Sequence, residues 1–116
     1  MKHEAKKINL IMNELINLMV RNGAEDIDIN IKHRGEISEL TLIHRNCHYS
    51  PQFVEEIRYD LSSQRQCELE GYYWQLVGDD EPSEELHLVG AMVDEAEVEL
   101  INNDLHIKVT RNEKKC

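Results

Sequence analysis

The chain has 116 residues, of which 41% are hydrophobic and 31% charged, and its formal net charge is −10. This length fits one modest core, so residues 1–116 are expected to form a single domain. An acidic surface repels phosphates, which disfavours nucleic-acid binding. No stretch approaches the ~18 apolar residues of a membrane span, and the charged N-terminus is unlike a signal peptide, so we expect a cytoplasmic protein with no membrane partner.

The N-terminal part of the chain predicts a helix followed by two strands. Apolar side chains recur at helical spacing through residues 5–22, and Gly23 stands where a left-handed residue commonly ends a helix. Three isoleucines then alternate with polar residues, which predicts a half-buried strand over about 26–33. After a turn at HRGE, a second alternating segment predicts a strand over about 37–44.

The rest of the chain predicts three helices and a closing hairpin. Ser50 followed by Pro51 is typical of a helix start, because serine caps the first turn and proline fits its backbone. The predicted helices span about 51–62, 66–77 and 83–94, and the predicted strands about 96–101 and 104–110.

All four predicted strands are apolar on one face only, so we expect helices to cover one face of the sheet and the other face to be exposed to solvent. We therefore expect an α/β (α+β) fold with the order α-β-β-α-α-α-β-β. This is a two-layer sandwich in which a four-stranded mixed or antiparallel sheet carries its helices on one face.

This pattern resembles the ATPase domain shared by gyrases, heat-shock-90 chaperones, histidine kinases and mismatch-repair proteins, the GHKL or Bergerat fold. The segment NELINLMVRNGAEDIDINIKHRGEISELTLI (13–43) is similar to its first helix, the N-box and the two following strands. The segment ELHLVGAMVDEAEVELINNDLHIKVTR (85–111) is similar to the helix behind its last glycine box and the closing hairpin. The resemblance concerns element order and spacing, and so implies fold more than activity.

The residues that carry the family's chemistry differ in this chain. The N-box of the family is a Glu followed four residues later by an Asn that holds magnesium. Glu14 matches the Glu, but Leu18 stands at the position of the Asn, and Asn17 lies one residue early, about 100° around the helix. Without the resemblance, Asn13 and Glu14 are polar helix residues that are expected to face solvent.

Two nucleotide-binding loops of the family are also replaced. Where the family has Asp-x-Gly-x-Gly, this chain has HRNCHYSP, with neither the aspartate that binds adenine nor the glycines. Where the last glycine box cradles phosphate, the chain has DDEPSEELHL, whose five carboxylates oppose an anionic ligand. Three nucleotide features are therefore lost or reversed.

Two further groups of residues are weak candidates for sites. His44, Cys47 and His48 offer metal-binding groups at short spacing, and Cys67 could add a fourth ligand, although ordinary strand-end and loop residues fit the same pattern. Nucleophilic chemistry at Cys47 lacks any sign of an oxyanion hole or an orienting group.

Three consecutive aromatic residues, Tyr72, Tyr73 and Trp74, lie on a predicted helix and cannot all point inward. Trp74 is then expected near the surface, where tryptophan either has no role or anchors a protein contact.

Three hypotheses follow from these patterns. The first is a non-catalytic regulatory or protein-interaction module, derived from an ATP-binding domain that has lost its cofactor, with a protein partner or a second copy as its ligand. The second is a working anti-sigma-type serine kinase, in which ATP and magnesium bind, Glu14 is the general base and Asn17 holds the metal. The third is an unrelated α+β protein that shares only the element order.

Overall fold

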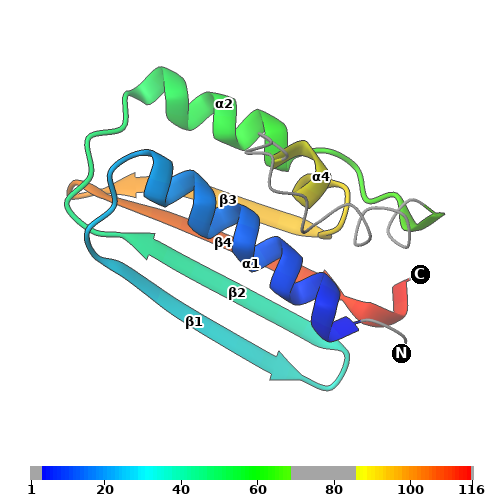
Figure 1. Ribbon diagram of the computed structural model, residues 1–116. Coiled ribbons are helices and arrows are strands. Elements are labelled where there is room, and N and C mark those ends of the chain that lie inside the picture. Colours follow the sequence, from blue (N-terminus) through cyan, green and yellow to red (C-terminus); the bar gives the residue numbers. More distant parts are fainter. Residues whose placement is uncertain (1–3, 69–85, 116) are drawn as a thin grey trace.

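A computed structural model describes residues 4–68 and 86–115 of the chain (Figure 1). The described helices are α1 (Glu4–Arg21), α2 (Pro51–Leu61), the short α4 (Leu86–Gly90) and a terminal 3-10 turn (Glu113–Lys115). The described strands are β1 (Ile27–Arg34), β2 (Ile37–His44), β3 (Glu95–Ile101) and β4 (Asp104–Asn112). Most of the helix predicted over 66–77 lies outside the described residues.

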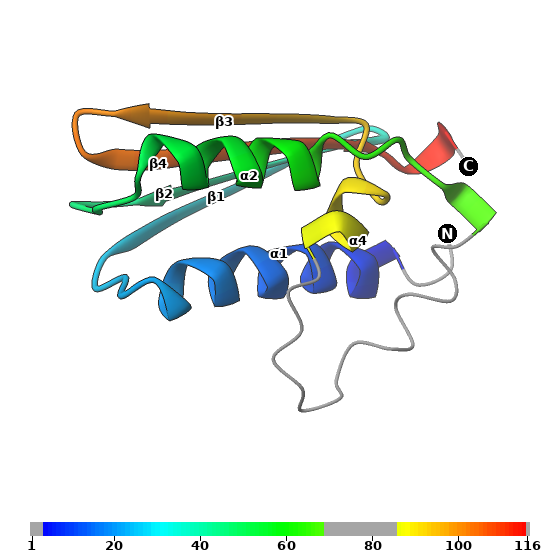
Figure 2. The ribbon, with the colours of Figure 1, turned by 90° about the horizontal axis from the view of Figure 1, so that it is seen from above.

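The four strands form one sheet in the order β1-β2-β4-β3, and every neighbouring pair is antiparallel. The helices pack against this sheet, and Figure 2 shows α1 and α4 on the same side of it while α2 runs along β3. The predicted α+β sandwich is therefore confirmed, and its sheet is antiparallel rather than mixed. Among the described helices, none is long and apolar enough to span a bilayer.

The core lies between the helices and the inner face of the sheet. Alternation in β2 and β4 sends every second side chain inward, so Leu40 and Leu42 meet Val109 and Ile107 across the ladder. The helices cover these rows with the apolar stripes of α1, α2 and α4, which include Ile11, Leu15, Met19, Val54, Ile57, Leu61 and Val89.

A buried ion pair between Glu4 and Arg111 connects the first turn of α1 to the end of β4. The Arg111 guanidinium donates from Nε to Glu4 Oε2 at 2.9 Å and from a terminal nitrogen to the Met92 carbonyl oxygen at 2.7 Å. Arg111 is nearly inaccessible, so its charge depends on these partners.

The predicted burial of β1 is only partly right. Ile27 is half-buried, but Ile29 and Ile31 remain 45% and 52% exposed. Both face the helical side, because their cross-strand neighbours are Leu42 and Leu40. The helical layer is narrower than the sheet, which leaves this edge strand uncovered.

The helix predicted over 83–94 ends early, at Gly90. A Cβ at residue 90 would lie 2.5 Å from the Asp60 carbonyl oxygen, so the chain passes against α2 where only glycine fits. The Ala91 carbonyl then accepts from the backbone N–H of Gln66 at 2.8 Å. This close approach turns the chain into β3 and sends Met92 into the core.

Candidate functional site

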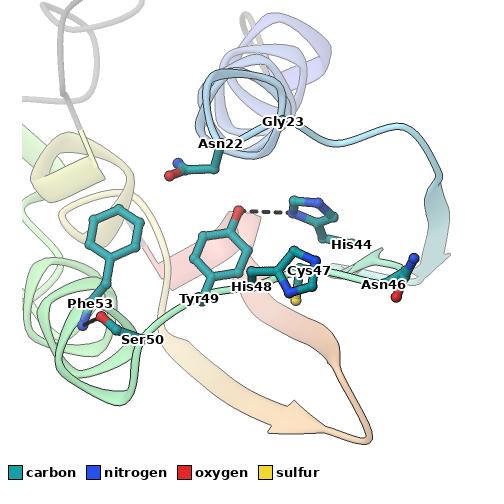
Figure 3. Close-up of a pocket in the computed structure, with 9 residues that line it drawn as sticks. All are labelled: Asn22, Gly23, His44, Asn46, Cys47, His48, Tyr49, Ser50 and Phe53. Carbon is teal, nitrogen blue, oxygen red and sulfur yellow. Dashed lines mark hydrogen bonds between the residues drawn. The ribbon is translucent and has the colours of Figure 1, made fainter.

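A pocket of about 370 Å³ opens where α1 ends, β2 ends and α2 begins (Figure 3). Its wall is formed by Asn22 and Gly23 after α1, by His44 at the end of β2, and by the loop that leads to α2. Phe53 closes it from the first turn of α2.

The end of α1 is shaped by a left-handed glycine. Gly23 has φ +82, its N–H donates to Val20, and the next N–H, from Ala24, reaches back to the Met19 carbonyl at 3.0 Å. The Asn22 side chain donates to the Leu18 carbonyl at 2.7 Å. These bonds satisfy the last carbonyls of the helix and fix Asn22 at the mouth of the pocket.

The loop after β2 is held by polar contacts with neighbouring turns. Arg45 bridges two carboxylates, Asp28 at 2.6 Å and Asp104 at 3.0 Å, and the backbone N–H of Asn46 donates to the same Asp104 at 2.9 Å. Asn46 adopts φ 54, which asparagine tolerates better than most residues. The pocket floor is therefore a fixed loop joined to the β3–β4 turn.

Three rings form the centre of the site. The His44 Nδ1 and the Tyr49 hydroxyl are joined by a hydrogen bond at 2.9 Å, with the two rings edge to face at 5.2 Å. Phe53 stacks on the other side of Tyr49 with ring centroids 5.6 Å apart. Figure 3 shows Tyr49 between the other two rings.

The described residues that line the pocket carry no permanent charge. Among the described residues that line the pocket, none is a lysine, arginine, aspartate or glutamate. Burial lowers the pKa of the His44 imidazole and raises the pKa of the Tyr49 phenol, so both rings favour their uncharged forms near neutral pH. The described lining therefore presents no permanently charged side chain to a phosphate.

The four candidate metal ligands lie in four different settings. His44 is 2% exposed and bonded to Tyr49, whereas His48 is exposed. The buried Cys47 thiol donates to the Asn103 carbonyl at 3.2 Å. Cys67 is disulfide-bonded and offers no thiolate.

Within residues 4–68 and 86–115, no group of three or more His, Cys, Asp or Glu side chains is placed to hold a metal ion. The Cys47 thiol bonds to a backbone oxygen rather than to a base, which gives no support to nucleophilic chemistry.

The two N-box candidates do not line this pocket. Asn17 is exposed, while Glu14 is 8% exposed, so the expectation that Glu14 faces solvent is wrong. Glu14 stands four residues from both Leu10 and Leu18, and it therefore shares their buried stripe on α1. Asn13, by contrast, is exposed as expected.

The interaction candidates Tyr72, Tyr73 and Trp74 lie outside the described residues, as does most of the acidic segment DDEPSEELHL. The predictions made for them stay predictions.

Comparison with protein-family models, curated proteins and solved structures gives no match for this chain.

The sequence did not reveal the ring cluster itself. Nothing in the sequence marks Tyr49, in a predicted loop, or Phe53, on a predicted helix, as a site residue, whereas His44 continues the inward alternation of Leu40 and Leu42. That alternation was the available signal that His44 points into the protein rather than towards a ligand.

Proposed function

We propose that this chain is a non-catalytic protein-interaction or regulatory module, related to the Bergerat-type ATPase domain but without its nucleotide chemistry. The element order, the antiparallel closing hairpin and the position of the first helix support the relationship. The site residues support the loss of chemistry.

One observation carries the proposal. Leu18, at the position where the family holds magnesium, is 3% exposed and belongs to the core. Turning the helix to bring Asn17 to that position would rotate it by about 100° and pull the apolar stripe of α1 off the sheet. The packing of α1 thus supports the proposed loss of the magnesium site.

The residues that line the pocket also support the proposed loss of nucleotide binding. Phosphate sites use cationic side chains or glycine-rich backbone at a helix start, and the described lining has neither a cation nor a helix N-terminus with glycines. A small-molecule ligand for these rings would be uncharged, which does not describe ATP.

Calorimetric titration of the chain with Mg-ATP tests the proposal. At about 50 μM protein, a dissociation constant of ~10 μM, about −7 kcal/mol, is well resolved, and we expect no saturable heat. Saturable heat that disappears in Glu14→Gln but persists in Asn13→Ala, an exposed neighbour on α1, would contradict the proposal and favour the serine-kinase alternative. The alternative of an unrelated α+β protein also predicts no heat, so the titration separates only the serine-kinase alternative from the other two.

A further inference from the structure

β1 is an edge strand whose outer side has no partner strand among the described residues. β2 pairs with it along its whole length, from Ile27 opposite His44 to Arg34 opposite Ile37. The outer edge of β1, which has eight residues, therefore presents backbone N–H and C=O groups that have no partner strand.

An apolar stripe lies beside this open edge. Ile29 and Ile31 point to the helical side of the sheet and are about half exposed. Another strand at this edge would flank both side chains, bury part of their surface and extend the inner apolar rows formed by Leu40 and Leu42.

Resting on the interaction role proposed above, we propose that β1 pairs antiparallel with β1 of a second copy of this chain. The two sheets then form one continuous sheet of eight strands, four from each copy. The two-fold axis passes through Asn30, so Ile29 of each copy lies opposite Ile31 of the other.

The charges of β1 select this register. With the axis at Asn30, Asp28 lies opposite Lys32 of the second copy, and Asp26 lies opposite Arg34 of the second copy. Symmetry repeats both pairs, and opposite charges directly across an antiparallel ladder are favourable. Asp28, Lys32 and Arg34 are exposed on the sheet face that carries no helix, and the Asp28 carboxylate also accepts from Arg45 of its own chain. Asp26 is exposed too and lies one residue before β1.

Other registers lose this match. A slide by one residue is excluded, because it would turn the isoleucines to the opposite face. A slide by two residues moves the axis to Ile29 or Ile31. It loses both of these pairs and forms a single opposite-charge pair instead, Asp26 with Lys32 or Asp28 with Arg34. Longer slides place Asp28 opposite itself, or Lys32 opposite itself.

The opposite edge of the sheet is protected against the same pairing. The Arg58 side chain donates from Nε to the Val98 carbonyl oxygen at 2.8 Å, so α2 already occupies part of the β3 edge. Glu95, Glu97 and Glu99 alternate along β3 on the open face, and aligned self-pairing would set glutamate against glutamate. Of the two edges of the sheet formed by the described strands, β1 alone is both open and self-complementary.

Cysteine cross-linking tests the register. In antiparallel pairing, the Cα atoms of directly opposed residues lie about 4.5–5.5 Å apart, within the span of a disulfide. Asn30→Cys is therefore expected to form a covalent dimer rapidly under mild oxidation. Glu97→Cys, an exposed open-face position on the other edge strand, is the matched control, and the native chain gives the background of its own cysteines. Cross-linking of Asn30→Cys no faster than these two would overturn the proposal.

Charge reversal tests the same contact without a covalent bond. Arg34→Asp places two aspartates opposite each other twice per dimer, so we expect the dimerisation constant to weaken about tenfold in sedimentation. Reversing both partners, with Asp26→Arg and Arg34→Asp together, is expected to restore the native constant. Neither residue makes an ion pair within the described part of the chain, so the fold should be unaffected. An unchanged constant in the single variant, or no recovery in the double variant, would contradict the pairing.

The two proposals fail in different ways. A chain that stays monomeric and binds no Mg-ATP contradicts the β1 contact alone. A chain that binds Mg-ATP contradicts the proposed function, whatever its oligomeric state.

Discussion

At the scale of single residues, His44 shows how a candidate ligand becomes part of the core. Its ring ends an inward-facing row of β2, and the Tyr49 hydroxyl bonds to its Nδ1 at 2.9 Å. A protonated imidazole would place a charge in an apolar setting, and burial accordingly lowers its pKa from the ordinary value of 6.5. The uncharged form of the His44 imidazole therefore stabilises the folded pocket.

This burial predicts a specific dependence of stability on pH. Below the ordinary pKa of 6.5, the unfolded chain takes up a proton at His44 that the folded chain resists. The free energy of unfolding should therefore be highest above this pH and decrease below it, with a slope of up to about 1.4 kcal/mol per pH unit from this group. Urea unfolding at a series of pH values measures this slope.

His44→Gln is the matched control, because the amide can still bond to the Tyr49 hydroxyl but does not titrate. The variant should lose this part of the slope and keep the part that comes from the carboxylates. Equal slopes in both proteins would show that His44 is not the source.

At the scale of elements, the important feature of α1 is which of its faces packs against the sheet. Leu18 and Asn17 are adjacent in sequence, yet one is buried in the core and the other is exposed. The stripe that buries Leu18 also buries Leu15 and Met19 against the sheet, so the register is set by packing along the whole helix.

A pair of substitutions tests this register. Leu18→Asn should lower the free energy of unfolding by about 3 kcal/mol or more, because it buries an amide and removes core packing. Asn17→Ala should change it by less than about 0.5 kcal/mol, as for most exposed positions. Urea unfolding midpoints measure both, and a tolerated Leu18→Asn together with a costly Asn17→Ala would contradict the observed register.

At the scale of the whole molecule, alternating hydrophobicity was enough to predict the sheet. The strands were expected within one or two residues of their observed ends, because inward-facing Leu40, Leu42, Ile107 and Val109 alternate with polar residues. Alternation shows which face of a strand is apolar, but not whether another layer covers that face. The exposure of Ile29 and Ile31 could not be predicted for this reason.

The remaining differences also have tertiary causes. The early end of α4 depends on the approach of Gly90 to Asp60, thirty positions away in the chain. The pocket forms where α1, β2 and α2 meet at one corner. The sequence therefore indicates His44 as a possible ligand by its chemistry, but it does not indicate the ring contacts with Tyr49 and Phe53. Glu14 and Asn17 were proposed from a resemblance in spacing, which does not define the side of the helix that packs.

The most direct test of an interaction module that pairs through β1 is sedimentation velocity of the native chain with Mg-ATP present. Interference optics follow the protein, and absorbance follows the nucleotide. Over about a hundredfold range of protein concentration, we expect the boundary to move from monomer towards dimer by mass action, while the nucleotide does not sediment with it. A monomer at every concentration, with nucleotide moving in the protein boundary, would contradict the account.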